Sequence, residues 1–78
     1  MTRQGFQEAK ETFDRILRLA PSNGWALYGR ANAALNLNDD REQAIRDLEQ
    51  ALKLPLPRAT RESAQKLLND LKARPPSP

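Results

Sequence analysis

An internal repeat of thirty-five residues is the feature that most constrains this chain. Shifting the sequence by that length sets the segment 6–9, Phe-Gln-Glu-Ala, against the segment 41–44, Arg-Glu-Gln-Ala. The same shift pairs further apolar or small residues in the same order, namely Phe13 with Leu48, Ile16 with Ala51, Leu17 with Leu52 and Leu19 with Leu54. A period of this length is typical of proteins that stack similar structural units side by side.

Both copies carry the spacing of an amphipathic helix. In the first copy, apolar side chains recur three or four residues apart and form one stripe, which consists of Ala9, Phe13, Ile16 and Leu17. The second copy has an equivalent stripe of Ala44, Ile45, Leu48, Ala51 and Leu52. Convincing strand alternation is lacking in the sequence. The pattern predicts an all-α fold.

Breakers and capping residues divide the chain into about four helices. Pro21 ends the first one, and Ser22 or Asn23 is suited to cap the second. Asn36 to Asp40 form a polar turn, and Pro57 suits the first turn of a last helix. We therefore expect helices at residues 3–20, 23–37, 40–54 and 58–73, followed by a disordered tail at 75–78.

Composition argues against an enzyme or a metal protein. The chain has no cysteine and no histidine, so thiolate sites, the usual general base and the commonest metal ligand are all missing. Asp39 and Asp40 are adjacent, but two carboxylates alone make a weak cation site, and helix capping explains them better. We expect no catalytic residues, no metal and no cofactor.

The charge is uneven along the chain. The net charge is +3, and residues 53–78 hold six basic and two acidic side chains. A basic end can attract nucleic acid, but no aromatic side chain lies among these cations to stack on bases, so nucleic-acid binding is not expected. The apolar runs are short, so we expect a soluble chain without a membrane span, with the cytoplasm as the favoured compartment.

Three stretches resemble the tetratricopeptide-repeat family: residues 26–35 (ALYGRANAAL), 42–45 (EQAI) and 47–52 (DLEQAL). In that family a repeat is a pair of antiparallel helices that cross closely at small residues. Ala31 matches the small position of the first helix, whereas the second helix is matched by Ala44, Leu48 and Ala51. The first copy keeps the second-helix pattern and ends at Pro21, the family's closing proline.

The chain also departs from the family pattern. The family period is 34 residues, and one extra residue lies in the turn near Asp39 and Asp40. Leu27 replaces the usual aromatic residue, and residues 54–57 (LPLP) replace a simple proline turn. These departures are those of a degenerate terminal repeat.

The resemblance implies an α-solenoid of stacked helix hairpins over residues 1–74. Residues 3–20 would be the second helix of a truncated repeat, 23–54 a complete repeat and 58–73 a capping helix. It further implies a protein-interaction module that binds a peptide or a partner helix. The groove-facing residues carried over by position are Trp25, Tyr28, Gly29, Asn32, Leu35 and Asn36.

Two of these expectations have a physical basis of their own. An Asn at position 32 offers both a donor and an acceptor to a ligand backbone, as an Asn of the family often does. Trp25 and Tyr28 are of the residue types best suited to anchor an interface. Alternatively, these two side chains pack on the first helix or on a missing neighbour.

Homotypic assembly is the second functional hypothesis. Because the first copy begins at its second helix, the chain is either a fragment of a longer array or has an apolar face that something else covers. We expect that face to hold Phe6, Phe13 and Leu17, and a homodimer could bury it.

Overall fold

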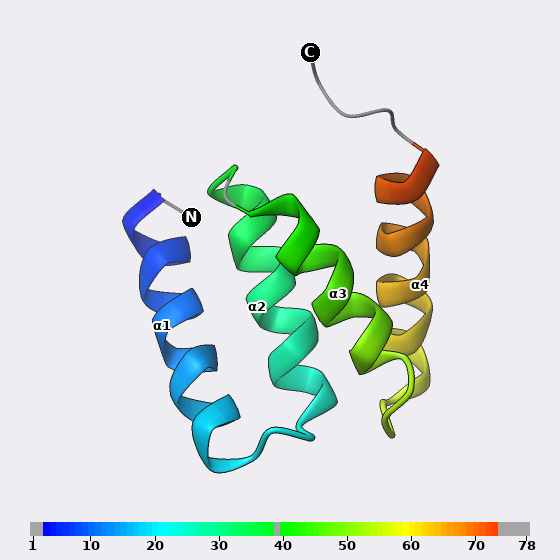
Figure 1. Cartoon of the computed structure of the whole chain (residues 1–78), viewed down its shortest axis with the longest axis horizontal. Helices are drawn as coiled ribbons and strands as arrows, with labels where there is room; N and C mark the ends of the chain where they lie inside the picture. Colours follow the sequence, from blue (N-terminus) through cyan, green and yellow to red (C-terminus); the bar gives the residue numbers. More distant parts are fainter. Residues whose placement is uncertain (1–2, 39, 74–78) are drawn as a thin grey trace.

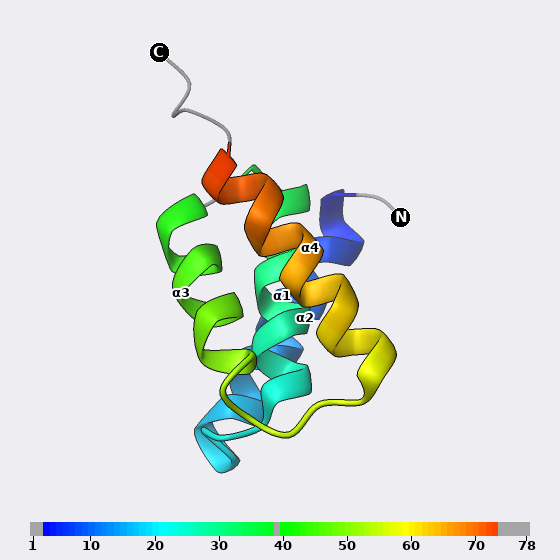
Figure 2. The same cartoon turned by 90° about the vertical axis from the view of Figure 1, so that its right-hand side faces the viewer.

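A computed structural model of the chain describes residues 3–38 and 40–73, and in these residues it contains four helices and no strand. The helices are α1 (Arg3–Leu19), α2 (Gly24–Asn36), α3 (Arg41–Ala51) and α4 (Arg58–Ala73). Successive helices run in opposite directions (Figure 1), and Figure 2 shows α4 beside α3 with α2 behind. The prediction of an all-α chain with about four helices is confirmed. The expected tail at 75–78 lies outside the described residues.

Side-chain caps begin the two middle helices. The side chain of Asn23 accepts a hydrogen bond of 3.0 Å from the amide of Ala26 at the start of α2. Asp40 accepts one of 3.1 Å from the amide of Gln43 at the start of α3. Each cap satisfies an amide that the first turn of a helix leaves free. The capping roles predicted for Asn23 and Asp40 are confirmed, whereas Asp39 lies outside the described residues.

Helix α3 ends at Ala51, three residues before the expected end at residue 54. The amides of Lys53 and Leu54 donate to carbonyls only three residues back, so the chain tightens into a turn. Pro55 also disfavours a helical conformation of the residue before it. Arg61 of α4 then donates to the carbonyls of Leu52 (2.9 Å) and Leu54 (3.0 Å), which holds this connection against α4.

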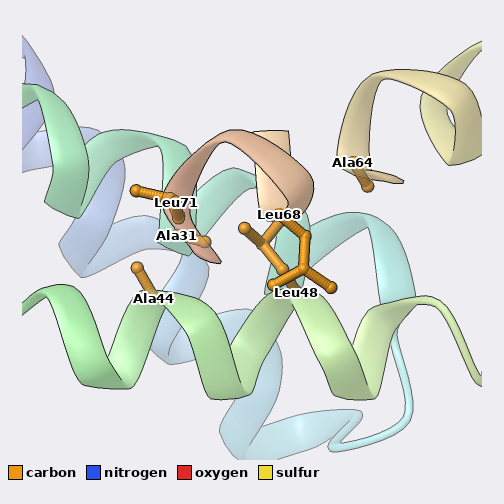
Figure 3. Packing of buried hydrophobic residues seen from close by; sticks show 6 residues of the cluster. All are labelled: Ala31, Ala44, Leu48, Ala64, Leu68 and Leu71. Carbon is orange, nitrogen blue, oxygen red and sulfur yellow. The ribbon is translucent and has the colours of Figure 1, made fainter. Parts of the chain in front are cut away.

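The main core cluster joins α2, α3 and α4 (Figure 3), and its buried members are Ala31, Ala44, Leu48, Ala64, Leu68 and Leu71. Ala31 and Ala44 are 0% exposed. A methyl group at each of these positions lets the helix backbones approach closely. Leu48, also fully buried, fills the space beside them.

A second cluster joins α1 to α2 and α3, and it consists of Leu17, Ala26, Leu27 and Ala51, with Phe13, Ile16, Leu54 and Leu56 packed against it. Leu17 is only 9% exposed. The expectation that Leu17 lies on an open face is therefore wrong. Its side chain packs with the buried residues of α2 and α3 and is not available to a second molecule.

Arg30 of α2 connects three helices through charge. Its guanidinium donates two hydrogen bonds to Asp47 of α3 (Nε–Oδ2 2.9 Å, Nη2–Oδ1 2.8 Å) and one of 3.0 Å to Asp14 of α1. The Asp47 side chain is 3% exposed and also accepts a 2.9 Å hydrogen bond from Gln43. The hydrogen bond to Asp47 raises the pKa of Arg30 against the opposing effect of burial, and Asp14 raises it further.

The close helix crossing gives a first prediction. Replacing Ala31 or Ala44 with Leu should lower the free energy of unfolding by about 1–3 kcal/mol, because the added atoms have no space between the helices. Ala59→Leu, at an exposed position of α4, is the control and should change it little. Urea unfolding followed by circular dichroism measures both, and equal stability of all three variants would contradict this packing.

The Arg30 network gives a second prediction. Asp47→Ala should lower the free energy of unfolding by about 3 kcal/mol, because it leaves a partly buried guanidinium without its main acceptor. Glu62→Ala breaks the exposed ion pair with Arg58, in which the side chains are 92% and 68% exposed, and should change stability little. Thermal unfolding of the two variants at equal ionic strength compares them; similar losses would show that the network does not hold the helices together.

Candidate functional site

An open pocket of about 260 Å³ lies between α1 and α2. Phe6, Ala9 and Phe13 of α1 line one side, and the α2 side is lined by Trp25, Tyr28, Gly29, Asn32 and Ala33. The pocket thus brings together four of the six residues predicted to face a groove and two of the three predicted for self-association. The two predicted surfaces are one site in the structure.

Two of the four aromatic residues that line the pocket are in direct ring contact. The rings of Phe13 and Trp25 meet edge to face, with centroids 5.1 Å apart and planes at 74°. Trp25 is nevertheless 52% exposed, which makes it one of the few large apolar side chains that the fold leaves in solvent. The alternative that Trp25 packs on the first helix and the hypothesis that it faces a partner are both compatible with this placement.

Gly29 gives the Phe13 ring its position. A Cβ atom at Gly29 would lie 2.3 Å from Cζ of Phe13 and 2.6 Å from each Cε atom. No side chain other than hydrogen fits there without moving the ring. The ring therefore lies directly over the backbone of α2, and the glycine in the middle of a helix is explained by this close approach.

The other predicted groove residues have different surroundings. Leu35 does not line the pocket but packs against the core cluster of α2, α3 and α4, as Tyr28 also does on its inner side. Asn36 lies outside the pocket as well, and its amide donates a 2.8 Å hydrogen bond to the carbonyl of Asn32. The Asn32 side chain is exposed at the pocket wall and is available to a ligand backbone.

Two residues of this site are not among those predicted from the sequence. Ala9 and Ala33 form part of the pocket wall, where their small side chains leave room between the helices. Ala9 could have been found because the repeat pairs it with Ala44, a fully buried residue at a helix crossing. The same shift pairs Ala33 with Leu68, another buried residue of the core, so the repeat carries a signal for Ala33 as well.

The chemistry of the pocket is that of apolar binding. No charged side chain is among its lining residues, and its polar side-chain groups are the Asn32 amide, the Tyr28 hydroxyl and the Trp25 indole N–H. In the described part of the chain no three His, Cys, Asp or Glu side chains are grouped so as to hold a metal ion. Within the same residues, no helix has the length and apolar character needed to cross a membrane.

Several cations of the C-terminal half have partners within the chain. Lys72 lies 2.9 Å from a carboxylate oxygen of Glu49, and Arg58 lies 3.2 Å from Glu62. Arg61 is bound to the two carbonyls at the end of α3. The contacts of Arg61 hold the connection after α3 against α4, whereas the exposed Arg58 pair contributes little to stability.

No family model matches the chain, and comparisons with curated proteins and with solved structures gave no significant match. The resemblance to tetratricopeptide repeats therefore stays a prediction that depends on the residues quoted for it.

The contact of Phe13 with Gly29 gives a third prediction. Phe13→Leu removes the ring atoms that a Cβ at position 29 would meet. In that background, Gly29→Ala should raise the free energy of unfolding by about 1 kcal/mol, the difference in helix propensity between the two residues. In the parent chain the same change must displace the ring, so the gain should be lost and the emission of Trp25 should change. Urea unfolding of the four chains completes the cycle, and equal effects of Gly29→Ala in both backgrounds would contradict the contact.

Proposed function

We propose that this chain is a protein-interaction module that binds a peptide or a helix of a partner protein in the pocket between α1 and α2. The observation that carries the proposal is the pocket itself, in which the exposed Trp25 stands next to Phe6, Phe13 and Asn32. Aromatic side chains at the edge of an apolar hollow are typical anchors of protein interfaces.

The size and lining of the pocket support a macromolecular ligand. Its volume of about 260 Å³ is below the ~300–1,000 Å³ of typical small-molecule sites, so it suits a few side chains of a larger partner. Asn32 can orient such a partner, because its amide offers one acceptor and two donors beside the apolar wall.

The proposal includes a tetratricopeptide-type architecture, in which α2 and α3 form the complete repeat, α1 is the second helix of a truncated repeat and α4 is the capping helix. The burial of the small residues Ala31, Ala44 and Ala51, each 0% exposed, supports it, since these are the positions at which the family favours small side chains. No catalytic role is proposed for any residue.

Homotypic assembly is an alternative use of the same pocket. Phe6 and Phe13 remain partly exposed there, although Leu17 is buried. A second copy would bury these two side chains symmetrically. Sedimentation of the chain over a range of concentrations separates this alternative from a module that is monomeric until it meets a different protein.

Selection from a random 16-residue peptide library against the intact chain provides the fourth prediction. Selected peptides should bind Asn32→Arg at least about tenfold more weakly than the parent, because a charged side chain at the wall obstructs the pocket and disfavours apolar burial. Asn69→Arg, the same change at an exposed position of α4, is the matched control and should bind like the parent. Peptides that bind all three chains equally would place the site elsewhere, and a library that yields no binder would refute the function.

A further inference from the structure

In sequence register, the helices on either side of the open pocket, α1 and α2, correspond to α3 and α4, between which the main core cluster lies. A shift of thirty-five residues carries α1 onto α3, and it also carries α2 onto α4. The shift thereby pairs three residues that line the pocket with buried members of the core cluster: Ala9 with Ala44, Phe13 with Leu48, and Gly29 with Ala64. Two more pairs follow, Asn32 with Leu67 and Ala33 with Leu68.

The space between α3 and α4 is occupied by one face of α2. Tyr28, Ala31 and Leu35 are the α2 residues that pack in that cluster, and Figure 3 shows Ala31 between the residues of α3 and α4. Three core residues are therefore more deeply buried than the residues paired with them at the pocket. Ala44, Leu48 and Ala64 are 0% exposed under this cover, whereas their counterparts at the open pocket are only partly buried.

We propose that the pocket takes a single amphipathic helix of a partner protein, seated against α1 and α2 as α2 is seated against α3 and α4. This inference rests on the proposed function and names the class of ligand. The occupant should present a large residue, a small one three positions later and a large one four positions after that, because Tyr28, Ala31 and Leu35 have this spacing in α2. The small residue would lie beside Ala9, because Ala31 shares the core cluster with Ala44, the residue in register with Ala9.

One difference between the open pocket and the filled core further specifies the sequence of the ligand. In the filled place, Arg30 of α2 is bound by Asp47 of α3. The residue of α1 in register with Asp47 is Thr12, whose hydroxyl donates to the carbonyl of Glu8. A cation at the equivalent point of the occupant would find no carboxylate in this position, so an uncharged residue is preferred there.

A peptide of residues 23–37 tests the inference with the chain's own helix as probe. It carries Trp25→Phe, so that Trp25 of the intact chain is the sole reporter, and Arg30→Leu for the reason given above. We expect saturable binding, a change in Trp25 emission and a gain of helix on binding. Methyl signals of Ala9 and Ala33 should shift while those of Ala44 and Leu48 stay in place. Shifts of Ala44 and Leu48 instead would mean that the peptide has replaced α2, which overturns the inference.

Variants of the peptide and of the intact chain test how strongly binding should change. Adding Ala31→Leu to the peptide should weaken binding about tenfold or more, because a bulky residue cannot cross Ala9 closely. Asn36→Lys in the peptide is the control and should bind like the probe. In α2 of the intact chain, Asn36 is exposed and does not belong to the core cluster. In the intact chain, Asn32→Arg should weaken binding to a similar extent, whereas Asn69→Arg should not.

The outcomes separate this inference from the proposed function. If library peptides bind in the pocket but tolerate proline at every position, while the helical probe does not bind, the ligand is extended and only this inference fails. If neither the library nor the probe yields binding sensitive to Asn32→Arg, both fail. If the intact chain forms a dimer that Asn32→Arg dissociates and the probe does not bind, the occupant is a second copy and the inference is overturned.

Discussion

The hydrogen bonds of Arg30 connect α2 to both α1 and α3, and they constrain the rotation of α2 about its own axis. With the guanidinium bound to Asp47 on α3 and Asp14 on α1, the adjacent Ala31 faces the α3–α4 core. Gly29, which precedes Arg30 in the sequence, lies against Phe13 of α1. A partly buried ion pair contributes little net stability compared with an apolar pair, but the two parallel hydrogen bonds between Arg30 and Asp47 restrict its geometry. We interpret this network as the element that determines which side of α2 faces which neighbour.

The pocket exists because small residues stand where two helices would otherwise fill the space. Ala9, Gly29 and Ala33 offer no side chain beyond a methyl group, and Leu17 and Leu27 pack in a separate cluster between the same two helices. Phe13 is held from two sides, by the Gly29 backbone and by the edge of Trp25. A glycine within a helix costs about 1 kcal/mol relative to alanine, so the chain gives up some local stability for this shape.

The sequence predicts the local structure well because the signals for it are local. Apolar residues three or four apart mark the helices, and Asn23 and Asp40 mark two of their starts. It failed where the outcome depends on distant residues. Nothing near Arg30 in sequence reveals that acceptors sixteen and seventeen positions away will meet it. Leu17 belongs to the same stripe as Phe13, and only the packing of α1 on α2 and α3 decides that one is buried and the other is shared with the pocket.

The same distinction applies to the candidate site. The groove residues come from positions in a repeat and the self-association residues from the open face expected for the first helix, but the meeting of several of them in one pocket follows from the antiparallel packing of α1 on α2 (Figure 1). Leu35 and Asn36 were assigned to the groove by position in a repeat, yet the turn of the helix carries Leu35 to the core side. The internal repeat then adds what neither helix shows alone. Because a shift of thirty-five residues pairs α1 with α3 and α2 with α4, the face of α2 that packs in the core is the pattern for the helix that we propose as the ligand of the open pocket.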